Sequence, residues 1–169
     1  MARSHYADIT FNTSAEDLLA AYRLNFRAKL KTKRAQRNLL MGGLVVGALC
    51  AAAAWIWPFA PLSIAAAIGV AYWMLFITAV FGAAYLRLPR QSRTIYAQQK
   101  SLHGRTTIEW DEKGITFKSV MGQSNFAWDD FIGIDAGSDV ILLRQSDAVM
   151  NFIPTRALTE DQVMDLASR

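Results

Sequence analysis

Few side chains in this sequence have the types and spacing that catalysis requires. Asp129 and Asp130 are adjacent carboxylates, but neighbours in a chain rarely face one another, and capping of the following turn accounts for at least one of them. The single Cys50 has no second thiol with which to form a disulfide or a zinc site. His5 and His103 lack the spacing of a metal-binding pair. We therefore expect no enzyme activity, no cofactor and no metal.

Two residues of the C-terminal part are candidates for packing or for contact with a partner. Trp128 stands where a predicted strand meets a turn, and its large apolar area predicts an anchor in the core, with a ligand platform as the alternative. Arg156 follows Pro154. We expect it to form a solvated ion pair with an acid, and binding of an anionic group is the alternative.

The densest group of charged side chains is basic and has no acidic residue among its members. A formal charge of only +4 indicates that this basic excess is local. The cluster is typical of a membrane topology signal, and binding of anionic lipid headgroups is the alternative. No arginine and aromatic interleaving accompanies it, so we do not expect nucleic acid as a partner. The members are Arg23, Arg27, Lys29, Lys31, Lys33, Arg34 and Arg37.

The elements that position these residues begin with an uncharged run from Asn38 to Leu86. It is long enough for two transmembrane helices, near 39–57 and 62–86, because a span needs about 17 to 25 apolar residues. The run divides at the segment 57–61, where prolines flank a short aromatic stretch. The sequence therefore predicts a transmembrane helical hairpin. A single anchor with a buried soluble helix would leave a second apolar stretch in water.

Basic residues flank both predicted spans, and the connecting loop carries no charge. Positive flanks favour the cytoplasm, so we expect a multi-pass protein with both termini cytoplasmic. Trp55, Trp57 and Phe59 would then lie at the outer interface, and Tyr85 at the inner one.

Small residues recur within both predicted spans. Gly43 and Gly47 match the GxxxG pattern, which allows two helices to approach closely. Ala51 continues this small face, and Ala65 and Gly69 provide a similar one in the second span. The pattern predicts packing within the hairpin, and a seam between copies is the alternative.

The segment before the spans predicts a strand around Ile9 followed by an amphipathic helix. Thr13 and Glu16 have the spacing of a capping box, and no proline occurs before Pro58. The helix is therefore expected to run into the first span as a rod. We also propose that the strand adds to an edge of the C-terminal sheet, since that domain is small for one core.

The residues after the spans predict a short helix and a small α+β domain. Pro89 favours a fresh helix start, and Thr159 with Gln162 predicts a capped final helix. The strands are expected at 106–110, 114–120, 125–128, 132–135, 140–144 and 149–153, forming an antiparallel meander. The predicted divisions are 1–37 for the strand and basic helix, 38–88 for the hairpin, 89–103 for a connecting helix and 104–169 for the cytosolic domain.

Three segments of the last domain carry a family resemblance: the turn and strand start at 111–115, the segment 126–134, and the stretch 152–158 before the final helix. With the two spans, they make the chain resemble the YcxB-like family of bacterial membrane proteins. The resemblance implies a pleckstrin-like half-barrel capped by a helix, attached to the bacterial inner membrane on the cytosolic side. It implies no established catalytic activity.

The expected function is therefore that of a non-enzymatic interaction module. The hairpin would hold the β-rich domain at the cytoplasmic leaflet for a protein or lipid partner. A structural subunit of a homo-oligomer or of a larger membrane complex is the alternative. An enzyme ranks third, because no nucleophile and base pair or phosphate-binding glycine loop is present.

Overall fold

The computed structural model describes residues 6–56, 61–146 and 148–169. The chain divides into two compact units. One unit comprises Met1–Asn25 and Leu88–Arg169, and the other comprises Phe26–Arg87. The predicted connection at 57–61, with Trp57 and Phe59, lies almost entirely outside the described residues.

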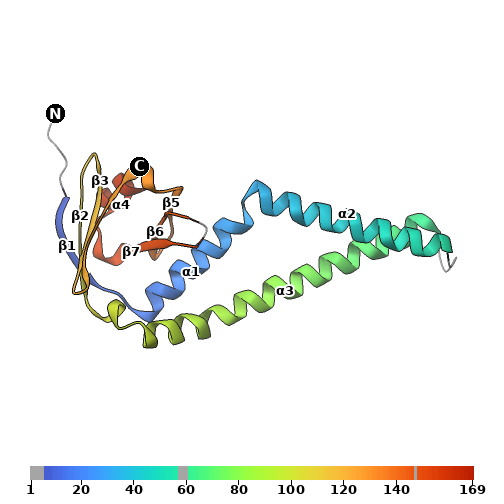
Figure 1. The fold of residues 1–169 in the computed structure, drawn as a ribbon, viewed down its shortest axis with the longest axis horizontal. Coiled ribbons are helices and arrows are strands. Elements are labelled where there is room, and N and C mark those ends of the chain that lie inside the picture. Colours follow the sequence, from blue (N-terminus) through green and yellow to red (C-terminus); the bar gives the residue numbers. More distant parts are fainter. Residues whose placement is uncertain (1–5, 57–60, 147) are drawn as a thin grey trace. The chain divides into compact units, whose positions relative to one another are not determined.

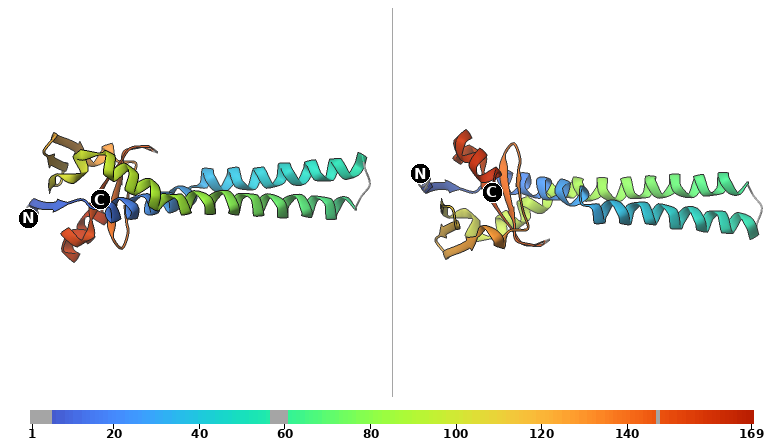
Figure 2. Two further views of the ribbon diagram at one scale, coloured as in Figure 1. Left: turned by 90° about the horizontal axis from the view of Figure 1, so that it is seen from below. Right: turned by 90° about the horizontal axis from the view of Figure 1, so that it is seen from above.

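Two long apolar helices dominate the unit Phe26–Arg87. They are α2 (Lys33–Ile56) and α3 (Leu62–Gln98), and each is long and apolar enough to cross a membrane. Within this unit they run antiparallel and contact each other from Leu39 and Trp73 to Cys50 and Gly69, while in Figure 1 they diverge towards Lys33. Figure 2 shows the pair from two further sides.

The predicted continuous rod is wrong, because α1 (Ala15–Leu30) ends before α2 begins. Thr32 lies at the break. Its hydroxyl donates to the carbonyl of Lys29 at 2.8 Å and accepts from the backbone N–H of Ala35 at 3.3 Å. One threonine thus closes the end of α1 and caps the start of α2, which ends a helix without proline or glycine.

The predicted fresh helix start at Pro89 is also wrong. Helix α3 continues through Pro89 to Gln98, and only the short helix η1 (Lys100–His103) follows it. A proline removes one helical hydrogen bond but has a backbone φ that suits a helix. Leu88 and Ser92 on either side are buried, so packing around the proline offsets the lost bond.

The capping box of α1 lies one residue later than predicted. The backbone N–H of Ser14 donates to Asp17 Oδ2 at 2.8 Å, and the N–H of Asp17 donates to Ser14 Oγ at 3.1 Å. Ser14 and Asp17, rather than Thr13 and Glu16, therefore cap this helix.

The other unit contains antiparallel strands and a C-terminal helix, as expected, but the strands form two sheets (Figure 1). The first sheet has the order β1-β2-β3-β4, and the second has the order β5-β6-β7. The strands are β1 (Tyr6–Asn12), β2 (Arg105–Trp110), β3 (Gly114–Ser119), β4 (Gly122–Ala127), β5 (Gly133–Ala136), β6 (Val140–Arg144) and β7 (Met150–Pro154).

The expected single meander is thus divided in two. Backbone pairing stops after β4, where the helix η2 (Trp128–Asp130) turns the chain. Pairing resumes when the N–H of Ile132 donates to the carbonyl of Arg144 at 2.7 Å. The turn residues predicted between two strands therefore separate two sheets.

The N-terminal strand joins the C-terminal sheet, as proposed from the sequence. β1 pairs antiparallel with β2, and Phe11 lies opposite Thr106. Phe11 also enters the main core with Ile108, Trp110 and Ile141. Residues 26–87 are therefore inserted between two neighbouring strands of one sheet.

The last helix and the first helix cover different parts of the second sheet. Leu166 of α4 (Glu160–Ala167) is buried in the main core, and the predicted Thr159–Gln162 capping box is present. A second cluster joins Ala21 of α1 to Val140 and Leu142 of β6. Helix η3 (Thr155–Ala157) connects β7 to α4.

Candidate functional site

The basic cluster occupies α1 and the start of α2. All seven side chains are exposed. Six of them lie within Phe26–Arg87, a unit whose sequence contains no acidic residue. None of the ion pairs found among the described residues involves these six. Their charge therefore faces solvent or another molecule.

The small residues of the two predicted spans lie where α2 meets α3. Gly43, Gly47, Ala65 and Gly69 are buried, and Ala51 is half-buried. A methyl group added at Gly69 would lie 2.9 Å from Cys50 Cβ and 3.0 Å from the carbonyl oxygen of Val46. These positions let the two backbones approach within one chain.

Trp73 is a contact residue that the sequence reasoning missed. Its Nε1–H donates to the carbonyl of Leu39 at 3.0 Å, and its ring lies against Gly42 and Gly43. The indole thus fills the space that the two glycines leave. A tryptophan inside one apolar helix, opposite paired glycines in the other, was the signal for this contact.

Trp128 is half-buried at the edge of the main core. Its Nε1–H donates to the carbonyl of Asp111 at 2.9 Å, and the guanidinium carbon of Arg169 lies 5.5 Å from its ring centroid. Trp110 is more deeply buried, at 1% exposure, and donates to Asp165 Oδ2 at 2.8 Å. The alternating pattern of 105–110 was the available signal for this second tryptophan.

Arg156 forms an ion pair that joins distant parts of the chain. Its guanidinium donates to Asp17 Oδ2 at 2.5 Å and to the carbonyl of Asn12 at 2.7 Å. The hydrogen bond with Asp17 raises the pKa of Arg156 above its ordinary value, with a smaller contribution from the charge of Asp17. Arg156 thereby connects η3 to the end of β1 and the start of α1.

The adjacent carboxylates Asp129 and Asp130 are both exposed. Asp130 Oδ2 accepts from the backbone N–H of Ala127 at 2.8 Å, which caps η2. This arrangement gives one carboxylate a structural partner rather than a catalytic one.

Cys50 and His103, the remaining candidate ligands among the described residues, do not share a site. Cys50 is half-buried against Gly69, and His103 bonds the carbonyl of Tyr96 at 2.8 Å. Within 6–56, 61–146 and 148–169, no three His, Cys, Asp or Glu side chains are grouped for a metal ion. His5 lies outside the described residues.

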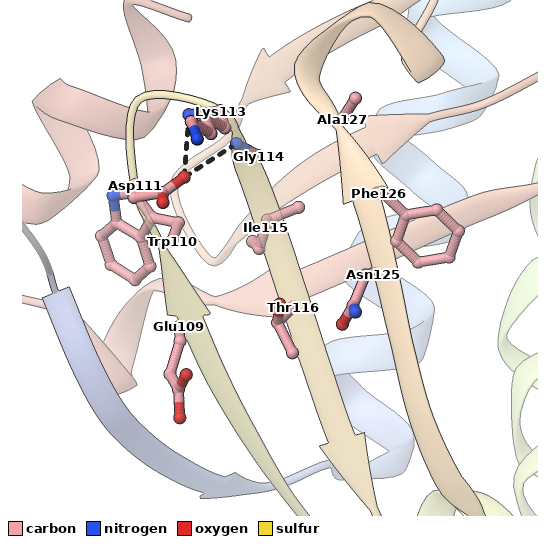
Figure 3. Close-up of a pocket in the computed structure, with 10 residues that line it drawn as sticks. All are labelled: Glu109, Trp110, Asp111, Lys113, Gly114, Ile115, Thr116, Asn125, Phe126 and Ala127. Atoms are coloured by element: carbon pink, nitrogen blue, oxygen red, sulfur yellow. Dashed lines mark hydrogen bonds between the residues drawn. The ribbon is translucent and has the colours of Figure 1, made fainter.

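A shallow pocket of about 420 Å³ lies on strands β2 to β4 (Figure 3). Glu109, Thr116 and Asn125 face one another across the three strands. Asp111 closes one end, where its Oδ1 accepts from the backbone N–H groups of Lys113 and Gly114 at 2.8 and 3.1 Å. The Thr116 hydroxyl and the Asn125 amide, beside a Glu109 carboxylate that is paired with Lys118, can hydrogen-bond the backbone or polar side chains of another polypeptide.

The fold around this pocket defines a small domain of two antiparallel sheets with a C-terminal helix. Residues 110–166 match the family described as YcxB-like protein. The resemblance noted in the sequence is therefore confirmed over this segment. Comparisons with curated proteins and with solved structures gave no significant match.

Proposed function

We propose that this protein is a non-enzymatic interaction module anchored in a membrane by α2 and α3. The observation that carries the proposal is the exposure of these apolar helices. Only 17% and 11% of their most apolar stretches are buried, and large side chains such as Leu44, Trp55 and Leu75 are exposed. A soluble core helix would bury such side chains, whereas a bilayer solvates them.

The pairing of β1 with β2 supports an even number of crossings. These strands precede and follow the two apolar helices and share one sheet. The chain before Phe26 and the chain after Arg87 must therefore lie on the same side of any membrane that the helices cross. Two spans satisfy this requirement, and one span does not.

Charge supports a cytoplasmic side for the paired strands. The basic cluster precedes the apolar part of α2, and exposed Arg87, Arg90 and Arg93 follow the apolar part of α3. Positive flanks on both sides favour a bacterial inner-membrane protein with both termini in the cytoplasm.

The β-rich unit is proposed to be a pleckstrin-like half-barrel that binds a protein. Four-stranded and three-stranded antiparallel sheets with a C-terminal helix support this fold. All 14 acidic residues lie outside 26–87, whereas 7 of the 18 basic residues lie inside, so the other residues carry a formal charge of −3. An acidic unit is repelled by an anionic leaflet, which favours a polypeptide partner on the pocket of β2 to β4.

The test uses full-length protein, cross-linked in native membranes and then purified. The control variant Met164→Arg changes an exposed residue of α4, and Asn125→Arg blocks the pocket. We expect a stoichiometric partner with the wild type and with Met164→Arg, and its loss with Asn125→Arg. Absence of a partner from the wild type, or equal loss in both variants, would contradict the proposal.

The alternative function is a structural or assembly subunit of a homo-oligomer or of a larger membrane complex. Gly82 favours it, because no atom lies within 4 Å of the position that its side chain would occupy. A small residue on an open helix face suits close approach by another helix. Loss of a cross-linked oligomer in Gly82→Leu would support this alternative.

A further inference from the structure

The charged ends of the two apolar helices are staggered. Leu39 contacts Trp73, and Arg37 stands just before Leu39, whereas Arg87 follows Trp73 only after fourteen positions. A second contact, of Gly69 with the carbonyl of Val46, lies nine positions after Arg37 and eighteen before Arg87, which gives a smaller offset of the same sign. At about 1.5 Å per residue, Arg37 and Arg87 are offset by roughly 13 to 18 Å along the helices.

The stagger leaves an uncharged length of α3 beyond the level of Arg37. It runs from about Phe76 to Leu86 and exposes large apolar side chains: Phe76 is 52% exposed and Leu86 is 77% exposed. This length cannot face water favourably, so it must be covered by lipid or by protein.

The end of α1 lies beside the same length of α3. The ring of Phe26 lies 6.0 Å from the ring of Phe81 and 5.8 Å from that of Tyr85, between centroids. Helix α2 begins just after the break at Thr32, and its residue Leu39 lies at the level of Trp73. The basic residues around the break therefore lie at the level of apolar α3 side chains rather than at the level of Arg87.

We propose that this junction binds an anionic membrane phospholipid. Lys31, Lys33 and Arg34 would hold the phosphate, and the acyl chains would lie along Phe76 and Val80 of α3. Charge complementarity supports this ligand, because the unit Phe26–Arg87 has basic residues and no acidic one. The apolar surface of α3 is continuous with the lipid-facing surface. This inference rests on the membrane anchoring proposed above.

The experiment uses the full-length protein in a neutral detergent. Its thermal unfolding is followed while phosphatidylglycerol, phosphatidylcholine or glycerophosphoglycerol is added, since a ligand that binds the folded state stabilises it. The triple variant Lys31→Gln, Lys33→Gln, Arg34→Gln tests the junction. Arg105→Gln, an exposed basic residue of the other unit that lies outside the pocket of β2 to β4, is the control.

We expect phosphatidylglycerol to stabilise the wild type and the control much more than phosphatidylcholine does. The triple variant should bind it roughly a hundredfold more weakly, since each of the three basic residues near an anionic surface contributes about fivefold. Equal stabilisation by phosphatidylglycerol and phosphatidylcholine would overturn the inference. An equal loss of phosphatidylglycerol affinity in the control variant would overturn it too. An equal effect of glycerophosphoglycerol would show a phosphate site without a role for α3, and would overturn it as well.

A separate measurement distinguishes this inference from the anchoring itself. Extraction of the protein from membranes by alkaline carbonate would contradict the proposed membrane anchoring. Resistance to extraction without a preference for phosphatidylglycerol would contradict only the proposed lipid site.

Discussion

Ile9 of β1 lies directly opposite Ile108 of β2, although 98 residues separate them in the sequence. Both apolar helices lie between these two residues. The β-rich unit is therefore assembled from the two ends of the chain, and its edge is completed by a strand that precedes the hairpin.

Deletion of residues 2–12 should make the C-terminal domain sensitive to protease. The deletion removes β1, exposes the edge of β2 and takes Phe11 out of the core. Limited proteolysis of membranes that contain the protein measures the effect. Deletion of residues 2–5, which precede β1, is the control, and equal resistance of both proteins would contradict the role given to this strand.

The variant Asp17→Ala should lower the free energy of unfolding by about 2 to 3 kcal/mol. It removes the cap of α1 and the partner of Arg156. Arg156→Gln should cost about 1 kcal/mol, because this side chain is 55% exposed. Since the pKa of Arg156 is raised, its contribution is present at neutral pH and is lost only as the pH rises through that raised value.

Urea unfolding in detergent checks these values. The exposed Asp129→Ala is the control, with an expected change within about 0.5 kcal/mol. If Asp17→Ala lowers the free energy of unfolding no more than the control does, the ion pair of Asp17 with Arg156 does not stabilise the unit.

Leucine at Gly69 should destabilise the hairpin, whereas leucine at Gly82 should not. The first would overlap Cys50 and the backbone of Val46, while the second extends into open space. Overpacking of this kind costs about 1 to 3 kcal/mol. Unfolding of the monomeric protein in detergent by sodium dodecyl sulfate measures the difference, and similar midpoints for the two variants would contradict the packing of α2 on α3.

Trp110→Ala should destabilise the β-rich unit more than Trp128→Ala does. Trp110 is fully buried and bonded to Asp165, whereas Trp128 lies at the edge of the core. We expect about 3 to 5 kcal/mol for the first and less for the second. Thermal unfolding measures which variant is less stable. A lower stability of Trp128→Ala would mean that Trp128, rather than Trp110, is the main anchor of the core.

The parts that the sequence could predict depend on local pattern. Val140–Arg144 is an apolar run between turn signals, and the strand has these bounds. Thr159 and Gln162 satisfy each other within one helical turn, so their spacing alone identifies the cap.

The parts that could not be predicted depend on contacts across the chain. Pro89 remains inside α3 between Leu88 and Ser92, which are both buried, and this burial is not visible in the local sequence pattern. Asp17 and Arg156 are 139 positions apart, and no local rule pairs them. The break at Thr32 depends on one hydroxyl that serves two helices, which a periodic pattern does not show.

Labelling of single cysteines in spheroplasts tests the central proposal most directly. In a Cys50→Ala background, Leu62→Cys places a thiol at the start of α3, and Ser4→Cys and Ser168→Cys place one near each end of the chain. A membrane-impermeant maleimide should label Leu62→Cys in intact spheroplasts, and should label the other two only after the membrane is opened. Labelling of both chain ends in intact spheroplasts, with Leu62→Cys protected, would contradict a hairpin that returns the chain to the cytoplasm.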